Sequence, residues 1–218
     1  MPVAVFDINE TTLDLGPVRS AVDELVGSEG GFVVWFQKLL QLSMTTTATG
    51  SYLDFSTLAR SALEAVAATS GRELSSDAMA GLGAGFSQLR AYSDVTPGLT
   101  QLRESGWRTI ALTNSAPSAV EGQLEAAGLT SLFEHIISVD RVKTYKPAAA
   151  PYSYVAELAK ASPEEMVMVA CHDWDLAGAR AVGYQTAFVR RPSMSYATIY
   201  PPPTFDTDDF VDLANQLG

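Results

Sequence analysis

Apolar residues along the chain first form one short unbroken run and then recur with a helical period. Residues 2–6 (PVAVF) are continuously apolar, which is typical of a strand that is buried on both faces. The apolar positions then follow a helical spacing in four segments, at residues 18–26, 32–44, 58–68 and 76–89. The glycine-rich stretch 27–31 and the polar stretch 45–55 interrupt these segments. The pattern therefore predicts one strand followed by a block of helices.

The pattern changes after Thr96-Pro97-Gly98, which is predicted to form a turn. Beyond this point, strands are predicted at residues 108–113, 136–138, 166–170 and 185–189, and helices at residues 99–104, 118–127, 150–159 and 176–182. Because strands and helices alternate, the chain is expected to form crossover units and a parallel sheet. The tail from Pro192 through the three prolines at 201–203 is predicted to be a surface loop before a last helix at residues 208–216.

The order of these elements predicts an α/β protein with a helical insertion. Residues 1–14 and 94–218 would form the sheet-containing core, and residues 15–93 would form a helical cap inserted after the first strand. A cap inserted there would lie over the carboxyl ends of the strands, where open α/β sheets bind their ligands.

Composition narrows the possible partners. The chain has 218 residues and a formal net charge of -11, because 25 acidic residues outweigh 14 basic ones. No basic stripe is present to neutralise phosphates, so no nucleic-acid partner is expected. No apolar run reaches the roughly 18 residues that a membrane span needs, and no signal peptide is evident. The single cysteine, Cys171, excludes an internal disulfide and suits a reducing compartment, so we expect a cytoplasmic protein.

Polar side chains follow the predicted strands at four places. They are Asp7, the stretch 113–115, Lys146, and His172 with Asp173 and Asp175. Taken singly, each is more often a helix cap, a turn residue or a solvated loop residue than a catalytic group. In a parallel sheet, however, all four places lie at the same edge, so a carboxylate, a hydroxyl, an ammonium and a second carboxylate would converge there.

These stretches, FDINETT, LTN, YKP and CHDWD with the following LAGARAVG, resemble the four motifs of the haloacid dehalogenase superfamily. Within the superfamily the resemblance is greatest to the L-2-haloacid dehalogenases. It implies a Rossmann-like parallel sheet core, an inserted helical cap and an aspartate nucleophile. Most members of the superfamily are magnesium-dependent phosphatases, so that activity is the first alternative.

Two positions argue against the phosphatase alternative. The phosphatases carry an acid-base aspartate two residues after the nucleophile, whereas this chain has Asn9, which cannot donate a proton as a carboxylic acid does. Their fourth motif supplies two carboxylates for magnesium, and here the first of these positions is Cys171. Magnesium prefers oxygen ligands to a thiol, so no metal and no cofactor is expected. A halide leaving group needs neither a proton nor a metal.

The resemblance therefore implies that Asp7 attacks the carbon that carries the halogen of a small halogenated carboxylic acid and forms an ester, which water hydrolyses. The predicted catalytic residues are Asp7, Thr11, Thr113, Lys146, His172 and Asp175. Lys146 would keep Asp7 ionised, and Asp175 would orient the lysine and the water. His172 stands where the family has an asparagine that positions this water, and it is expected either to take a proton from the water or to be a structural histidine.

The predicted substrate-binding residues are Asn9, Phe36, Asn114, Tyr152 and Trp174. Tyr152 is interpreted either as a tyrosine lining the site or as an ordinary half-buried helix residue. Phe36 stands where the family carries an arginine that receives the halide, and it cannot supply that charge. It would line a halide pocket with Trp35 and Trp174, or pack within the cap. Arg60 is a conceivable substitute, an inactive binding relative is the second alternative, and a homodimer is suggested by the resemblance.

Overall fold

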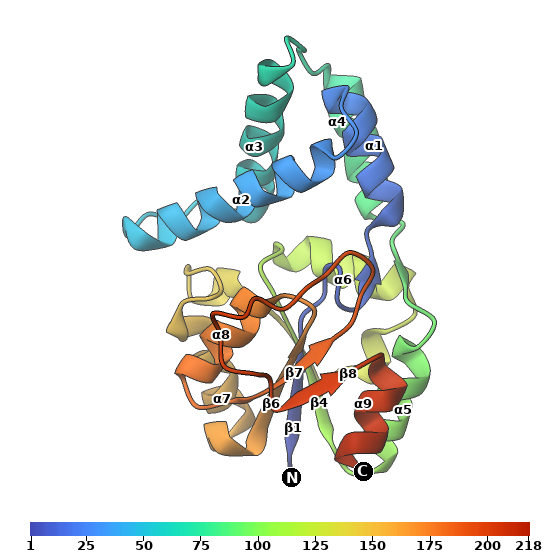
Figure 1. Ribbon diagram of the computed structural model, residues 1–218, viewed down its shortest axis with the longest axis vertical. Coiled ribbons are helices and arrows are strands. Elements are labelled where there is room, and N and C mark those ends of the chain that lie inside the picture. The colour runs from blue at the N-terminus through green and yellow to red at the C-terminus, as the bar shows by residue number, and fades with distance from the viewer. The chain divides into compact units, whose positions relative to one another are not determined.

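The computed structural model describes residues 1–218, which form two compact units. The first unit comprises Met1–Asp14 and Arg90–Gly218, and the second comprises Leu15–Leu89. Figure 1 shows that the first unit contains the sheet and that the second is helical. The assignment of these units as a catalytic core and a cap stays a prediction.

A six-stranded parallel sheet forms the centre of the first unit, which confirms the predicted α/β class. Its strand order is β5-β4-β1-β6-β7-β8. The strands are β1 (Val3–Phe6), β4 (Arg108–Thr113), β5 (His135–Ser138), β6 (Met166–Ala170), β7 (Gln185–Val189) and β8 (Phe205–Thr207). Phe6, the last residue of the central strand, is in register with Ala111 of β4 and Val169 of β6. The segments that follow these three strands therefore begin at the same edge of the sheet.

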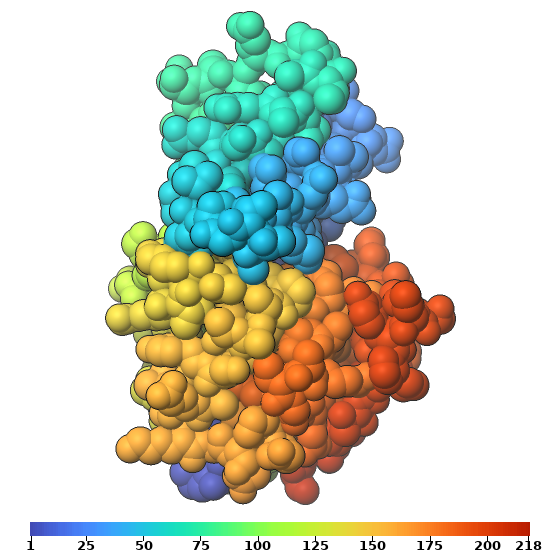
Figure 2. Space-filling view, turned by 90° about the vertical axis from the view of Figure 1, so that its left-hand side faces the viewer, coloured from blue at the N-terminus to red at the C-terminus, as the bar shows by residue number.

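Helices cover both faces of this sheet. They are α5 (Val95–Glu104), α6 (Pro117–Ala126), α7 (Ala149–Ala159), α8 (Asp173–Ala181) and α9 (Phe210–Leu217). In Figure 1, α7 and α8 lie on one side of the strands, and α5 and α9 lie on the other. The yellow and orange segments around α7 form much of the face of this unit that Figure 2 shows. Strands buried on both faces explain the continuous apolar runs in the sequence.

The second unit consists of four helices with an aromatic cluster. They are α1 (Gly16–Val26), α2 (Gly31–Ala48), α3 (Phe55–Thr69) and α4 (Ser76–Phe86). Trp35 is buried, its indole N–H donates to the carbonyl of Ala59, and its ring lies 6.1 Å from that of Phe86. Two short strands of the first unit, β2 (Leu13–Asp14) and β3 (Arg90–Ala91), pair where the chain leaves and re-enters that unit.

The structure corrects three sequence-based expectations. The predicted turn at Thr96–Gly98 lies in the first turn of α5, where a proline is tolerated because its missing N–H has no intrahelical partner. The polar stretch from Thr45 remains helical as far as Ala48, and the hydroxyls of Thr45 and Thr46 donate to carbonyls of the preceding turn. The tail contains strand β8, which is too short to show a periodic pattern. None of the helices has the length and apolar character needed to cross a bilayer.

Candidate active site

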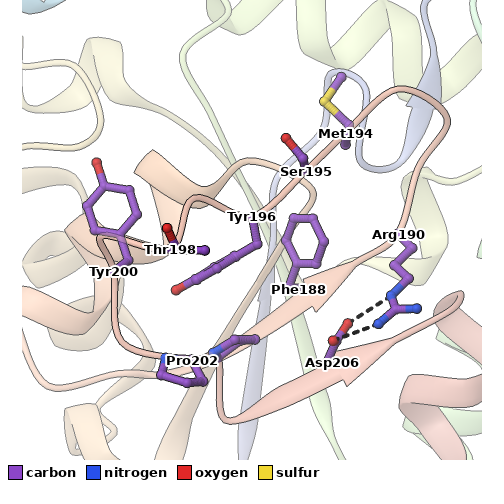
Figure 3. A pocket seen from close by; sticks show the side chains of 10 residues that line it. Phe188, Arg190, Met194, Ser195, Tyr196, Thr198, Tyr200, Pro202 and Asp206 are labelled. Carbon is purple, nitrogen blue, oxygen red and sulfur yellow. Dashed lines mark hydrogen bonds and ion pairs between the residues drawn. The ribbon is translucent and has the colours of Figure 1, made fainter.

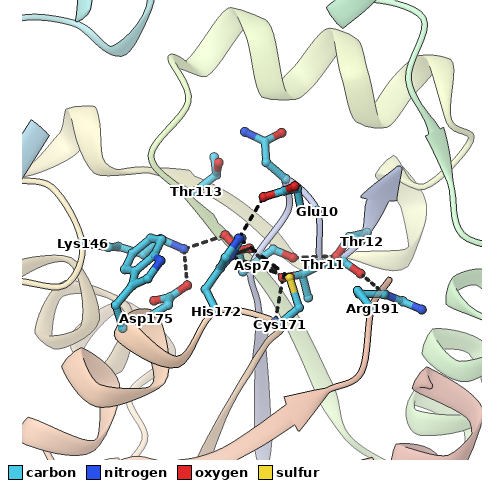
Figure 4. A network of polar contacts seen from close by, with 12 residues as sticks. Asp7, Glu10, Thr11, Thr12, Thr113, Lys146, Cys171, His172, Asp175 and Arg191 are labelled. Atoms are coloured by element: carbon cyan, nitrogen blue, oxygen red, sulfur yellow. Dashed lines mark hydrogen bonds and ion pairs between the residues drawn. The ribbon is translucent and has the colours of Figure 1, made fainter. Parts of the chain in front are cut away.

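Asp7 lies directly after β1 and is 5% exposed. Its Oδ1 accepts a hydrogen bond from the Lys146 ammonium at 2.8 Å, and its Oδ2 accepts one from the Thr11 hydroxyl at 2.7 Å. Burial by itself would raise the pKa of this carboxyl, but Lys146 and His172 outweigh burial and hold the pKa well below its ordinary value. Asp7 is therefore an anion with both oxygens held in fixed directions (Figure 4).

Lys146 lies between two carboxylates and is 1% exposed. Its ammonium donates to Asp7 at 2.8 Å, to Asp175 at 2.6 Å and to the carbonyl of Leu112 at 3.1 Å. These three bonds use all three donors of the ammonium. Burial would lower the pKa of Lys146, but Asp175 and Asp7 raise it, so the lysine carries its charge inside the protein. The ammonium neutralises a site that would otherwise hold two buried like charges.

Asp175 is completely buried in the first turn of α8. Its Oδ2 accepts from Lys146, and its Oδ1 accepts from the Tyr152 hydroxyl at 2.6 Å. Burial raises the pKa of Asp175 in spite of the neighbouring ammonium. Tyr152 is 0% exposed rather than half-buried, and its place behind Asp175 suits a supporting contact better than a contact with substrate.

His172 stands between two acidic side chains. Its Nδ1 is 3.3 Å from Asp7 Oδ2, and its Nε2 is 3.1 Å from Glu10 Oε2. Burial would lower the pKa of the imidazole, but Cys171, Asp7 and Glu10 together raise it well above its ordinary value. The Trp174 ring stacks on the imidazole with 5.3 Å between centroids. The raised pKa favours the protonated form of His172 beside Asp7.

Glu10 is the residue at this site that sequence reasoning missed. It is 4% exposed, although it stands in a polar stretch that reads as a loop. The signal that could have found it is a second acidic residue inside FDINETT, three positions after the candidate nucleophile. Only the backbone after β1, which turns Glu10 towards His172, reveals the contact.

The second predicted motif supports the site through local hydrogen bonds. Asn114 Oδ1 accepts from the backbone N–H of Lys146 at 3.1 Å, and Thr113 Oγ1 accepts from the backbone N–H of Ser115 at 3.2 Å. The amide of Asn9 donates to the Ser115 hydroxyl at 3.0 Å, while its buried Oδ1 has no hydrogen-bond partner.

The polar loop after β1 is anchored from the opposite side of Asp7. Arg191, just beyond β7, donates to the carbonyl of Thr11 at 2.9 Å and to both carboxylate oxygens of Asp94 at 2.9 Å. The Thr11 hydroxyl also accepts from the backbone N–H of Cys171 at 3.0 Å. The loop that carries Asp7, Glu10 and Thr11 is therefore fixed to two further segments of the sheet.

The donor set does not suit magnesium. A lysine ammonium lies between Asp7 and Asp175. The side chain of Cys171 is a thiol and not an oxygen ligand, and it lies 3.3 Å from the Thr11 hydroxyl. No three histidine, cysteine or acidic side chains are grouped so that they could hold a metal ion. A hard cation prefers several oxygen ligands and would have to displace the ammonium.

The sequence-predicted residues of the first unit come together, but Phe36 belongs to the second unit. Asp7, Thr11, Lys146, His172 and Asp175 form one connected network. The Phe36 ring stacks on that of Phe32, with centroids 5.8 Å apart and an interplanar angle of 7°. Packing within the helical unit is thus observed, and a contact of Phe36 with substrate stays a prediction.

A separate hollow lies on the first unit, beside β7 and β8. Its volume is about 520 Å³, and Figure 3 shows that Phe188, Tyr196, Tyr200 and the Arg190–Asp206 ion pair line it. None of the predicted site residues belongs to its lining. The candidate active site is therefore the buried network around Asp7 and not this hollow.

The protein has a parallel α/β sheet, and an aspartate that is paired with a lysine follows the central strand. These features define a class of α/β proteins whose site is built around an aspartate. The sequence model of the haloacid dehalogenase-like hydrolase family matches residues 1–183 of this chain. The chain belongs to this family, which confirms the resemblance seen in the sequence.

Individual relatives agree with this assignment. The chain is 32% identical to (S)-2-haloacid dehalogenase 1 of Pseudomonas sp. (strain CBS-3), over 98% of this chain and 95% of the relative. It is 27% identical to haloacetate dehalogenase H-2 of Moraxella sp. (strain B), over 92% and 90% of the two chains. The solved L-2-haloacid dehalogenase from Xanthobacter autotrophicus with chloropropionic acid covalently bound superposes with a TM-score of 0.89 and 26% identity, covering 100% and 98% of the two chains.

Proposed function

We propose that this protein hydrolyses small 2-haloalkanoic acids to 2-hydroxy acids through an ester on Asp7, without a metal. The observation that carries the proposal is a buried aspartate anion held by Lys146 and Thr11, with no carboxylic acid at Asn9. Such a carboxylate is a nucleophile, and halide leaves without a proton. The names of the relatives, (S)-2-haloacid dehalogenase and haloacetate dehalogenase, support the same reaction.

In the first step, one Asp7 oxygen attacks the carbon that carries the halogen. A carbon–oxygen bond forms while the carbon–halogen bond breaks, and halide leaves with the bonding electron pair. Attack opposite the leaving group inverts the configuration at this carbon. In the second step, water attacks the carboxyl carbon of Asp7, so the inverted centre is untouched and a 2-hydroxy acid is released. The covalently bound chloropropionic acid of the Xanthobacter relative supports such an intermediate.

The proposed roles of the neighbouring side chains follow from their contacts. We propose that Lys146 keeps Asp7 ionised and that Asp175 orients Lys146, with Tyr152 supporting Asp175. Thr11 would hold the second oxygen of Asp7, and His172 would act on the hydrolytic water.

The residues proposed to contact substrate lie in different kinds of surroundings. Asn9, whose amide donates to Ser115, and Trp174, beside His172, would line the space for a bound haloacid. Asn114 and Thr113 would act mainly by holding the loops that carry Lys146 and Ser115. Phe36 would line the apolar part of the halide pocket, an assignment that rests on the family resemblance.

Halide release tests the proposal directly. The wild-type protein is expected to release chloride from 2-chloropropionate after treatment with a chelator, and Asp7→Asn is expected to lower the rate on the order of 10⁴-fold or more. Asp206→Asn removes an exposed carboxylate of the same unit and should leave the rate unchanged. Magnesium-dependent turnover of an aryl phosphate without halide release would favour a phosphatase, and neither activity would favour a binding relative.

Two further expectations concern the protein in the cell. We propose a cytoplasmic location, which the single reduced cysteine suits. We also propose a homodimer, on the family resemblance, and light scattering would then give about twice the chain mass of 23.2 kDa.

A further inference from the structure

Arg191 is a buried cation that the mechanism described so far does not use. It lies two residues beyond the end of β7 and is 8% exposed. Its two Nη atoms donate to the two carboxylate oxygens of Asp94, each at 2.9 Å. The guanidinium carbon also lies 4.1 Å from the centre of the Tyr92 ring and 5.2 Å from that of the Phe210 ring. A bidentate ion pair packed against aromatic rings holds the guanidinium in one orientation.

The remaining guanidinium nitrogen, Nε, reaches the loop that carries the proposed nucleophile. It donates to the carbonyl of Thr11 at 2.9 Å. The hydroxyl of the same threonine donates to Asp7 Oδ2 at 2.7 Å and accepts from the backbone N–H of Cys171 at 3.0 Å. In Figure 4, Asp7 and Arg191 lie on either side of Thr11. Thr11 therefore binds the arginine with its backbone and holds the nucleophile with its side chain.

We propose that Arg191 is a positioning residue for Asp7, which it aligns through Thr11. The inference rests on the proposed function, because it assigns a task in the attack on the carbon that carries the halogen. A hydroxyl holds a carboxylate oxygen in one direction only if the backbone that carries the hydroxyl is itself fixed. The attack needs this carboxylate in line with the breaking bond, and a misplacement of about 1 Å costs on the order of 10² in rate. Arg191 thus acts on alkylation without touching substrate.

The geometry requires a guanidinium and not merely a positive charge. A guanidinium is a planar fork, so two of its nitrogens bind Asp94 while the third points at Thr11. Asp94 is fixed in turn, because its Oδ2 accepts from the backbone N–H of Phe210 at 2.9 Å. Arg191→Lys keeps the charge but offers a single nitrogen, which cannot reproduce these three bonds. This substitution therefore separates charge from alignment.

Single-turnover halide release from 2-chloropropionate, with the enzyme in excess, tests the inference. It measures the rate constant of alkylation, and its dependence on enzyme concentration gives the apparent Kd of the substrate. In Arg191→Lys the rate constant is expected to fall roughly 10- to 100-fold. The apparent Kd should change by less than about 2-fold, because Arg191 does not contact substrate.

Arg180→Lys is the matched control, an arginine of the same unit with similar bonds. Its guanidinium donates to the carbonyls of Pro201 and Pro202 at 2.7 Å and to the Thr186 hydroxyl at 2.8 Å. These partners lie in β7 and in the tail, and not in the loop after β1. The control also exchanges a guanidinium fork for an ammonium, so urea denaturation should show a loss of stability. The rate constant of alkylation should nevertheless be unchanged.

Thr11→Val tests whether the arginine acts through the threonine. This substitution removes the hydroxyl and keeps the carbonyl that Arg191 binds. In the Thr11→Val background, Arg191→Lys should lower the alkylation rate by less than about 2-fold, because the bond that the arginine aligns is already absent. In the Thr11→Ser background, which keeps the hydroxyl, the full loss should return. A merely structural arginine would give the same further loss of rate in both backgrounds.

A wild-type alkylation rate in folded Arg191→Lys would overturn the inference. A full further loss in the Thr11→Val background would do the same, and so would a weaker apparent Kd at an unchanged rate constant. Asp94→Asn covers the case in which Arg191→Lys does not fold, because it keeps the arginine and weakens the bonds that orient it. It should slow alkylation with the same dependence on the Thr11 hydroxyl. An absence of halide release from the wild-type protein would instead overturn the proposed function itself.

Discussion

At the scale of single residues, the site depends on one ammonium between two carboxylates. Lys146 bonds to Asp7 and Asp175 in a region from which water is excluded. Without it, two buried like charges would face each other, and one would take up a proton. Because a protonated Asp7 would be no nucleophile, the lysine would control the proposed chemistry although it has no covalent role.

Replacing Lys146 by methionine tests this dependence. Lys146→Met keeps the length of the side chain but is expected to lower halide release by on the order of 10²-fold or more and to lower the free energy of unfolding by about 3 kcal/mol. Urea denaturation and halide assays would measure both effects. Lys143→Met, at an exposed lysine paired with Asp140, should change stability by less than about 0.5 kcal/mol. Activity near wild type in Lys146→Met would contradict the role.

At the scale of elements, the close approach of α8 to the loop after Lys146 positions Asp175. A Cβ atom at Gly178 would lie 2.5 Å from the carbonyl oxygen of Pro147 and 2.7 Å from the hydroxyl of Tyr152. Only glycine allows this approach, and the Tyr152 hydroxyl is the donor to Asp175. Packing of the helix and orientation of the carboxylate are therefore coupled.

Gly178→Ala is expected to separate α8 from this loop. The clash with backbone atoms should cost about 1–3 kcal/mol of unfolding free energy and weaken the bond from Tyr152 to Asp175, so that halide release falls as well. Gly122→Ala, in α6, meets no atom within 4 Å and should stabilise the protein by up to about 1 kcal/mol. Equal stability of the two variants in urea denaturation would contradict the coupling.

At the scale of the whole molecule, acidic residues dominate the charge and determine how stability depends on pH. Lys146 and His172 lower the pKa of Asp7, although burial by itself would raise it. Arg191 lowers the pKa of Asp94 in the same way. A carboxyl with a lowered pKa stabilises the fold above its unfolded-state pKa, and this contribution is lost as pH falls. The raised pKa of His172 affects the alkaline side of the pH range. Its contribution to the free energy of unfolding is complete below about pH 6.5 and is lost at high pH. Asp175, whose pKa burial raises, opposes the effect of Asp7 and Asp94, because its contribution to stability also falls as pH rises.

Stability is therefore expected to be greatest near pH 5 to 6.5 and to fall by about 1–2 kcal/mol between pH 5 and pH 3. Urea denaturation at fixed ionic strength across this range would measure it. Asp94→Asn should be less stable at pH 6 but show a shallower acid slope, because it no longer takes up a proton on unfolding. A flat profile for the wild-type protein would contradict the assignment of paired, ionised carboxylates.

The sequence by itself determined the α/β class, the positions of the main strands and helices, and the residues Asp7, Lys146, His172 and Asp175. It could do so because a strand buried on both faces is continuously apolar, and because its carboxyl end is marked by the first polar residue. Local periodicity also determined that a helical block interrupts the core.

Only the tertiary structure decided which partners these residues have. The contact of Glu10 with His172 joins positions 162 residues apart, and that of Tyr152 with Asp175 depends on how closely two helices pack. Strand β8 forms because β7 offers it an edge, and not through any pattern of its own. Hydrophobic periodicity records which side of an element is buried, whereas a hydrogen bond between distant segments exists only once the sheet has brought them together.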